Sequence, residues 1–256
     1  MPIENVQHVF VCPTCRSALT WGLSGAQCEL CRVEYPIAGG VPFFCASDAA
    51  PTDQPSGLAE ATFRNPGGYA LVVKAKRAIY QDAQLGTEEH IRNQVVLDVG
   101  CGPNLDFEHL ENHHALAKRY VGIDLSAEFV LSARRRHGEE RYAFAQASAV
   151  SLPLPNKSVD TSILSFTLHH VSGDPRRLVD EMVRVTRSKL IILDHLRSER
   201  ALPGTIQRTC WRFFDGGCNY LSQSQWEDLL QNLHIQKRVQ TGAIFGHVVK
   251  FLCAVP

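Results

Sequence analysis

Four cysteines near the start of the chain are spaced for metal binding. Cys12 and Cys15 form one CxxC pair and Cys28 and Cys31 form a second, with twelve residues between the pairs. Thiolates three positions apart can bind one ion from a tight turn, and two such turns complete the tetrahedron that Zn²⁺ prefers. Because four thiolates leave no open coordination position, we expect a structural zinc site with no catalytic role. Cys45 falls outside this pattern.

A glycine-rich turn follows an apolar segment in the middle of the chain, where the sequence reads Val96-Leu-Asp-Val-Gly-Cys-Gly-Pro-Asn104. Glycine lets the backbone approach a ligand closely, and the helix that follows would present unpaired N–H groups to an anionic group. Asp98 is costly in an apolar strand unless it is paired, so it fits a site that holds a cation. Asp124, after the next predicted strand, could accept hydrogen bonds from ribose hydroxyls, or it could cap the following helix together with Ser126.

Histidines and aromatic residues follow the later strands. His169 and His170 come just after one predicted strand, and Asp194-His195 ends the next. Since histidine titrates near neutrality, each could take a proton from a hydroxyl or thiol, or simply shape the pocket through hydrogen bonds. Aromatic residues could enclose an apolar or planar substrate, or pack a helix on the sheet. The substrate-pocket candidates are Tyr69, Tyr80, Trp211, Phe214 and Tyr220.

The elements that must position these groups alternate between strand and helix from about residue 94. We expect strands at Val95–Val99, Arg119–Ile123, Arg141–Ala145, Val159–Ser165 and Lys189–Asp194. We expect helices at Asp106–Lys118, Glu128–His137, Pro175–Thr186 and, after a capping box at Ser222, Gln223–Leu233. Two short strands near 235–237 and 248–254 would close the chain as a hairpin. This order predicts an α/β fold with helices on both faces of a parallel sheet, which binds ligands at the carboxyl ends of its strands.

Composition and charge narrow the function classes. The chain has 256 residues, 45% of them hydrophobic, and its 26 Lys+Arg balance 26 Asp+Glu. This composition is globular, and zero formal net charge argues against indiscriminate binding to nucleic acid or to anionic membranes. Short basic clusters at 74–77 and 134–136 leave a local nucleic-acid contact open. With no apolar run near the ~20 residues of a membrane span and no signal-peptide pattern, we expect a cytoplasmic protein.

The segment around the second cysteine pair resembles a known zinc ribbon. Residues 31–44 read CRVEYPIAGGVPFF, which is similar to the YPI–Gly–(I/V)P stretch in the small activator subunit of tRNA and protein methyltransferases. The resemblance covers about residues 8–45 and implies a methyltransferase domain after it. We therefore expect a zinc-ribbon domain at 1–45, a Pro-rich polar linker at 46–58, and a main domain at 59–256. Within it, 59–85 would be helical, as a lid or as a helix packed on the sheet.

The main domain resembles the class I S-adenosylmethionine-dependent methyltransferases, in their menaquinone-biosynthesis-like branch. The matching motifs are VLDVGCGPN, VGIDLS and ASAVSLPLPNKSVDTSILSFTLHHV. The resemblance implies that Asp98 acts on the methionine ammonium, that Gly100 and Gly102 line the cofactor, and that Asp124 binds the ribose. The sequence departs from this family at two positions. Asn104 stands where the family has a third glycine, and Ser148-Ala149 stands where the family has the Asp-Ala pair that contacts adenine. The implied cofactor-binding set is Asp98, Gly100, Gly102, Asn104, Asp124, Leu125, Ser148, Ala149, Ser165 and Phe166.

The resemblance implies methyl transfer from S-adenosylmethionine to an O, N or S atom of a small molecule. The candidates for a catalytic base are His169, His170 and His195. One alternative is methylation of an rRNA or tRNA base, because some rRNA methyltransferases also carry an N-terminal zinc ribbon; the neutral charge disfavours it. Another is transfer or cyclisation of the aminocarboxypropyl arm of the same cofactor. The oligomeric state is left open.

Overall fold

The computed structural model describes residues 9–45, 87–105, 107, 117–138, 140–243 and 246–256, which form two sheets. The predicted linker at 46–58, the helical segment at 59–85 with Tyr69 and Tyr80, and most of the predicted helix Asp106–Lys118 lie outside the described residues. The domain boundaries stay predictions. Within the described residues, no helix is both long enough and apolar enough to cross a membrane.

The N-terminal sheet is a four-stranded antiparallel ribbon. Its strands follow in chain order: β1 (Thr20–Trp21), β2 (Gly25–Cys28), β3 (Val33–Ala38) and β4 (Val41–Pro42). Gly39 and Gly40 form the turn between β3 and β4 at φ values of 58° and 75°, a region that glycine enters without steric cost. The rings of Phe10 and Tyr35 both meet Phe44 edge to face, so the small ribbon has its own aromatic core.

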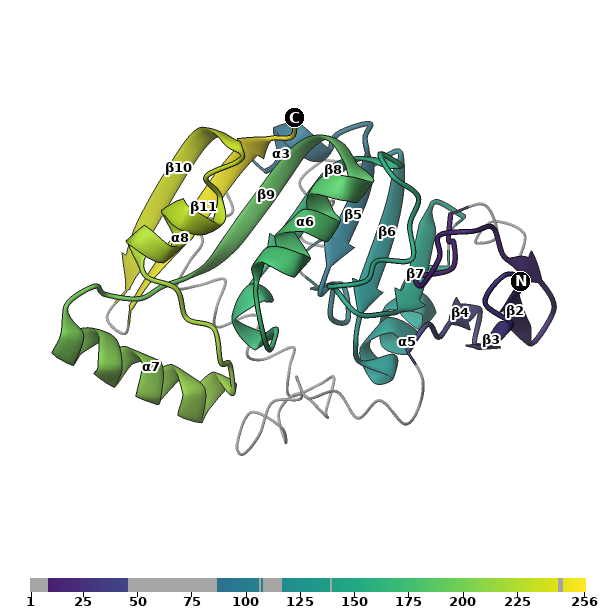
Figure 1. Cartoon of the computed structure of the whole chain (residues 1–256), viewed down its shortest axis with the longest axis horizontal. Coiled ribbons are helices and arrows are strands. Elements are labelled where there is room, and N and C mark those ends of the chain that lie inside the picture. Colours follow the sequence, from purple (N-terminus) through teal and green to yellow (C-terminus); the bar gives the residue numbers. More distant parts are fainter. Residues whose placement is uncertain (1–8, 46–86, 106, 108–116, 139, 244–245) are drawn as a thin grey trace.

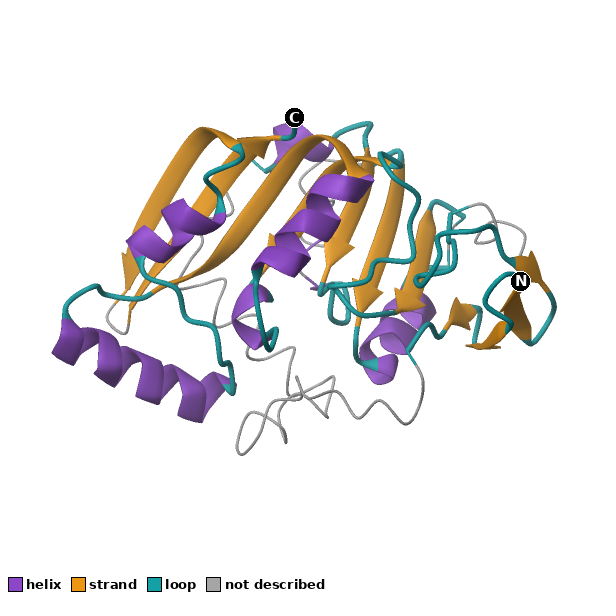
Figure 2. Ribbon diagram, viewed as in Figure 1, coloured by secondary structure: helices purple, strands orange, loops and turns teal. Residues whose placement is uncertain are grey.

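The main sheet has seven strands in the order β10-β11-β9-β8-β5-β6-β7 (Figures 1 and 2). Its five parallel strands are β5 (Val95–Val99), β6 (Arg119–Asp124), β7 (Tyr142–Gln146), β8 (Val159–Ser165) and β9 (Thr186–Leu196). The predicted closing hairpin is present as β10 (His234–Ala243) and β11 (Gly246–Ala254), which pairs antiparallel with β9. The sheet is therefore mixed, and the carboxyl ends of its five parallel strands meet at one edge.

Helices cover both faces of this sheet. They are α3 (Glu88–Ile91), α5 (Ala127–Arg136), the 3₁₀ turn η2 (Leu168–His170), α6 (Arg176–Val185), α7 (Ala201–Asp215) and α8 (Gln223–Leu229). The amphipathic α6 buries Leu178 and Met182 in the same core as Leu97 and Leu164 of the sheet, and α8 adds Trp226 to it. On the opposite face, Val130 and Ala133 of α5 share a second core with residues of β6 and β7. The α7 helix lies apart from the sheet, beside the edge where β9 ends (Figure 1).

The predicted elements that fall on described residues are confirmed, with differences at their ends. The Ser222–Gln225 capping box begins α8, as predicted, but the helix ends at Leu229 and not at Leu233, because a turn from Leu230 leads directly into β10. Strand β9 begins at Thr186, three residues before the predicted strand. The Thr186 hydroxyl lies 2.5 Å from that of Ser162 and donates to the carbonyl of Met182 at the end of α6, so helix passes into strand without a loop.

The ribbon lies against β7, the edge strand of the main sheet (Figure 1). Phe43 pairs with Gln146 in a parallel bridge, and the N–H of Phe44 donates to the Gln146 carbonyl at 2.8 Å. Buried residues of the ribbon, including Phe10 and Phe44, belong to the same hydrophobic core as Ala147 and Leu152 just after β7. The ribbon and the main sheet therefore share one core.

Candidate active site and metal centre

The glycine-rich turn after β5 has the backbone that a close ligand approach requires. Gly100, Gly102 and Asn104 all have positive φ, at 73°, 54° and 63°. A Cβ on Gly100 would lie 2.2 Å from the Thr167 hydroxyl oxygen, so no other residue fits there without moving η2. Asn104 is not a glycine but adopts the left-handed conformation, which asparagine tolerates better than most residues.

The Asn104 side chain is enclosed within this turn. It is 0% exposed, and neither its amide nitrogen nor its amide oxygen has a hydrogen-bond partner among the described residues. Leaving such a group unsatisfied costs free energy, so a buried amide without a partner indicates a polar group that the structure does not contain.

Asp124 joins the end of β6 to the glycine-rich turn. Its Oδ2 accepts the Gly102 N–H and its Oδ1 accepts the Ser126 N–H, both at 2.8 Å. Burial raises the pKa of Asp124, while the N–H groups of Ser126, Gly102 and Leu125 oppose that rise. Helix α5 is capped by the Ser126 side chain, which accepts from Phe129. Capping of α5 therefore does not account for the hydrogen bond between Asp124 and the Gly102 N–H, which joins β6 to the glycine-rich turn.

Asp98 is buried at the centre of the sheet, and its structural partner is Tyr120. The Tyr120 hydroxyl donates to Asp98 Oδ2 at 2.8 Å, and burial together with this carboxylate raises the pKa of Tyr120. A Cβ on Gly122, opposite Asp98 in the register, would lie 2.9 Å from the Tyr120 ring. The sequence analysis missed both Tyr120 and Gly122. Only the pairing register of β5 and β6 reveals that these two residues lie beside Asp98, and the spacing of residues in the sequence does not determine that register.

The loop after β7 lies beside Asp124. The Ala147 N–H donates to the Asp124 carbonyl at 3.0 Å, and Ser148 and Ala149 follow, both partly exposed. The Gln146 side chain donates to the Leu125 carbonyl at 3.0 Å. The structure thus brings this loop next to the strand-end carboxylate, although the sequence analysis did not single out Gln146.

Ser165 and Phe166 end β8 on the opposite side of the glycine turn. Phe166 has a φ of 50°, a strained value for a bulky residue, and its N–H donates to Leu193 at 2.8 Å. The Thr167 hydroxyl donates to the Ser165 carbonyl at 3.0 Å and so stays against Gly100. The Phe166 ring meets the His195 ring edge to face, with ring centres 5.3 Å apart.

Two of the candidate bases, His169 and His195, form a buried cluster with Asp194, and His170 lies beside it. His169 Nδ1 lies 2.6 Å from Asp194 Oδ1, and both side chains are 1% exposed. The His169 ring centre is 4.1 Å from that of His170 and 4.8 Å from that of His195. Burial opposes ionisation of Asp194, but the charges and hydrogen bonds of His169 and His195 lower its pKa below the ordinary value. The Asp194 carboxylate is therefore ionised at neutral pH.

Two of the predicted aromatic pocket residues surround this cluster. The Trp211 ring centre is 4.7 Å from that of His195, and the Tyr220 ring stacks on His169 at 5.3 Å. Both rings are buried, at 8% and 4% exposed. The Phe214 side chain lies outside what the structure describes. The neighbouring Phe213 is 61% exposed and makes no part of this enclosure.

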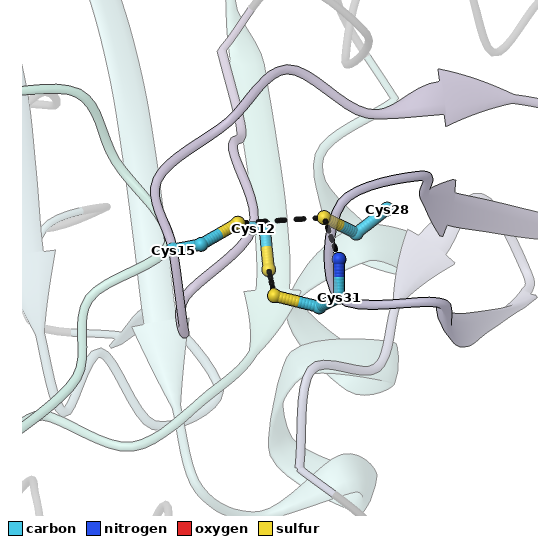
Figure 3. Close-up of side chains that lie close together, drawn as sticks. All are labelled: Cys12, Cys15, Cys28 and Cys31. Atoms are coloured by element: carbon cyan, nitrogen blue, oxygen red, sulfur yellow. Dashed lines mark hydrogen bonds between the residues drawn. The ribbon is translucent and has the colours of Figure 1, made fainter.

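The four N-terminal cysteines converge on one point (Figure 3). Cys12 Sγ lies 4.0 Å from Cys31 Sγ and Cys15 Sγ lies 3.4 Å from Cys28 Sγ, so these are free thiols and not disulfides. All four sulfur atoms lie within 4.8 Å of one another. A tetrahedral ion with zinc–sulfur bonds of about 2.3 Å would hold its sulfurs about 3.8 Å apart, close to these separations. A hydrogen bond with the Cys15 thiol, together with burial, raises the pKa of Cys31 to about 12, and a bound cation would instead favour its thiolate.

Comparison with known proteins gives a family match for the central part of the chain. Residues 97–192 match the family model described as "Methyltransferase domain". An uncharacterised methyltransferase of Mycobacteroides abscessus is 35% identical over 100 residues, covering 38% of this chain and 37% of that protein. The malonyl-[acyl-carrier protein] O-methyltransferase of Yersinia pestis is 32% identical over 147 residues, covering 57% and 49%. The chain thus spans less than half the length of these curated relatives.

Solved structures share the fold. An S-adenosylmethionine-dependent methyltransferase of Aquifex aeolicus superposes with a TM-score of 0.57 and 20% identity, covering 75% of this chain and 99% of that one. A chain from the complex of the Haloferax volcanii Trm112 methyltransferase activator with a methyltransferase gives a TM-score of 0.63 and 14% identity, covering 78% and 99%. At these identities the likeness shows the fold alone, which is the Rossmann-like methyltransferase fold.

Proposed function

We propose that this chain, whose residues 97–192 match the family model of a methyltransferase domain, binds S-adenosylmethionine at the carboxyl edge of its sheet and methylates a small molecule beside β8 and β9. The observation that carries the proposal is the Asp124 carboxylate, which the Gly102 N–H holds next to the glycine-rich turn. Bound S-adenosylmethionine would supply an electrophilic methyl group on its sulfonium. The chain would supply orientation, exclusion of water and, where the acceptor needs it, a proton acceptor.

The described residues fit this cofactor. Asp124 keeps lone pairs for two ribose hydroxyls while it accepts two backbone N–H groups. The buried, unpartnered amide of Asn104 lies in the turn that would face the amino-acid part. Asp98 supplies a carboxylate for the ammonium at the end of β5, and Ser148 would accept from adenine without contributing charge.

A small-molecule acceptor is supported by the aromatic residues beside the candidate bases. The rings of His195, Trp211 and Tyr220 pack together as a buried cluster, which suits contact with a compact and partly apolar group. The Yersinia pestis relative is named for O-methylation of a malonyl group on a carrier protein, which is also a small acceptor group. The neutral formal charge of the chain does not favour a polyanionic substrate such as RNA.

We also propose that Cys12, Cys15, Cys28 and Cys31 bind one structural Zn²⁺. The near-tetrahedral spacing of their sulfurs supports this, and the CRVEYPIAGGVPFF segment adds the resemblance to the activator subunit. The ribbon would then be a built-in counterpart of that subunit, seated on β7 of the domain it accompanies.

Calorimetric titration with S-adenosylmethionine and S-adenosylhomocysteine tests the cofactor assignment. We expect one site per chain, and we expect Asp124→Asn to weaken it strongly while an exposed-residue control, Asp180→Asn, leaves it unchanged. No binding by the wild-type protein would contradict the proposal. Product analysis then separates the alternatives: S-adenosylhomocysteine indicates methyl transfer, methylthioadenosine indicates transfer of the aminocarboxypropyl arm, and a steeply salt-dependent RNA gel shift indicates an RNA substrate.

A further inference from the structure

The His169–Asp194 pair joins a buried imidazole to a buried carboxylate. Nδ1 of His169 and Oδ1 of Asp194 are 2.6 Å apart, which is short for a nitrogen–oxygen hydrogen bond and typical of a charge-assisted one. Because an ionised carboxylate only accepts, Nδ1 must carry the proton, and in the neutral ring Nε2 then holds the lone pair. The pair therefore presents a basic nitrogen in a fixed tautomer.

Several further contacts fix the pair in place. Asp194 also accepts the backbone N–H of His195 at 2.7 Å and that of His169 at 3.3 Å, so its carboxylate cannot rotate freely. The His169 carbonyl accepts the N–H groups of Cys218 and Asn219 at 2.7 and 3.0 Å. A Cβ on Gly217 would lie 2.7 Å from Cδ2 of the His169 ring. The loop after α7 thus packs directly on this imidazole and holds its orientation.

We propose that His169, oriented by Asp194, is the proton acceptor of this site, and that the methyl acceptor is a hydroxyl group on a planar apolar molecule. This inference rests on the methyl transfer proposed above. His169 is the catalytic residue in this assignment, and Asp194 is a positioning residue that acts through it. The planar scaffold follows from the rings of Phe166, Trp211 and Tyr220 around the histidines.

The proton inventory explains why the acceptor is a hydroxyl. As the oxygen–carbon bond forms and the sulfur–carbon bond breaks, the sulfonium takes the electron pair and becomes a thioether. The hydroxyl proton moves to Nε2 of His169, and the Asp194 carboxylate stabilises the resulting imidazolium. A carboxylate acceptor is already ionised at neutral pH, and a thiol, with a pKa of about 8.5, loses its proton more readily than a phenol or an alcohol, so both need this pair less. Alcohols and phenols lose their proton least readily and gain most from it.

Asp194 bonds the ring of His169, which is buried, and accepts a bond from the backbone N–H of His195. His170 is partly exposed. A metal ion held by His169, Asp194 and His195 is the competing reading, since their donor atoms lie within 4.8 Å of one another. It would, however, have to break the 2.6 Å hydrogen bond.

Histidine-ring NMR tests the pair without a substrate. With ¹⁵N-histidine labelling and bound S-adenosylhomocysteine, we expect the His169 ring to be in the Nδ1–H form when neutral and to take up its second proton between pH 5 and 9. Asp194→Asn should move that midpoint down by about one pH unit or more, because it removes the charge that stabilises the imidazolium. The control His234→Gln, on an exposed strand position, should not move it. A His169 ring with one unchanged protonation state across the range, or a midpoint that Asp194→Asn does not move, overturns the assignment.

Turnover with matched acceptors tests the hydroxyl. We expect 2-naphthol to be methylated in preference to 2-naphthoic acid and 2-naphthalenethiol, and we expect His169→Gln to lower kcat for it by about 10²- to 10⁴-fold with little change in KM. Preference for the acid or the thiol, equal rates in His169→Gln, or no turnover of any of the three overturns the inference. Calorimetry with S-adenosylhomocysteine keeps this separate from the proposed function, because His169→Gln should retain its affinity. Elemental analysis closes the metal alternative: a second metal ion that is lost in His169→Gln also overturns the inference.

Discussion

The hydroxyl of Ser151 donates a hydrogen bond of 3.1 Å to the carbonyl oxygen of Pro13, which lies between the two cysteines of the first pair. Two residues further on, the Pro153 carbonyl accepts the Val11 N–H at 3.0 Å. The first cysteine turn is therefore bonded directly to the loop that carries Ser148 and Ala149. On the other side of the loop, Gln146 accepts the Cys45 N–H at 3.3 Å and donates to Leu125. The ribbon thus supports both ends of the candidate adenine loop.

This arrangement predicts that loss of the metal weakens cofactor binding. Cys12→Ser should abolish the bound zinc, free the Pro13 carbonyl from its fixed position, and lower the affinity for S-adenosylmethionine about 5- to 150-fold, the range of a coupling free energy of about 1–3 kcal/mol. Elemental analysis and calorimetry on the same preparation measure both effects. The matched control is Cys210→Ser on α7, an exposed cysteine that should keep one zinc per chain and full affinity. Full zinc content in Cys12→Ser contradicts the metal site, and full affinity without zinc contradicts the coupling.

Asp124 predicts a pH dependence of cofactor binding. Burial raises its pKa above the ordinary value of 3.8. The carboxylate therefore takes up a proton at a higher pH than an exposed aspartate would, and the protonated group loses acceptor capacity for ribose hydroxyls. The affinity for S-adenosylmethionine should hold at neutral pH and fall as the pH is lowered toward the raised pKa. The Asp124→Asn variant should bind S-adenosylmethionine about 10²-fold more weakly at pH 7, equivalent to about 2.7 kcal/mol. Its affinity should also no longer fall as the pH is lowered. A wild-type affinity that stays constant as the pH is lowered from 7 to the ordinary aspartate value of 3.8 would argue against Asp124 as the ribose acceptor.

The strand positions and the polar groups at strand ends could be predicted from the sequence, because both are local. Five runs of apolar and β-branched residues became β5 to β9, and the candidate bases lie just after β8 or at the end of β9. The partners of these groups could not be predicted, because they depend on register and tertiary contact. Tyr120 reaches Asp98 only because β5 and β6 pair Val96 with Tyr120, and Gln146 meets Cys45 only because the ribbon docks on β7. Spacing likewise identified the histidines, but the 2.6 Å bond that distinguishes His169 is a property of the folded chain.

Alanine substitutions at Gly100 and Gly173 separate the stability cost of steric crowding from the cost of a left-handed backbone. Its φ of 73° and the 2.2 Å approach of a Cβ to Thr167 predict that Gly100→Ala is disfavoured twice. The left-handed backbone costs about 1–2 kcal/mol for alanine. Displacing Thr167 adds about 1–3 kcal/mol, as overpacking generally does. Gly173 has a similar φ of 83° but nothing within 4 Å of its Cβ, so Gly173→Ala should show the backbone cost alone. Urea denaturation of both variants measures the difference, and equal losses would contradict the close contact with η2.

Glu181 predicts an acid-sensitive link between the ribbon and the main domain. Its carboxylate accepts two bonds of 2.7 Å from Arg184 and the Leu152 N–H at 2.8 Å, and Arg16 of the ribbon lies 3.4 Å away. Burial opposes its ionisation, but Arg184, the Leu152 N–H and Arg16 together lower the pKa of Glu181 below 4.5. Because the folded pKa is below the unfolded one, the stabilisation is complete above pH 4.5 and is lost as the pH falls through the folded value.

Replacing this carboxylate should therefore cost stability at neutral pH and remove part of its acid dependence. Glu181→Gln should lower the free energy of unfolding by about 1.5–3 kcal/mol at pH 7, the range for a hydrogen bond to a charged group. Below pH 4.5 the variant and the wild type should converge, because the wild-type carboxyl is then being protonated. Urea denaturation between pH 7 and pH 3.5 measures the gap, with the exposed Glu140→Gln as the control that should match the wild type at every pH. A gap that stays constant down to pH 3.5 would show that Glu181 stabilises the fold by packing and not by its charge.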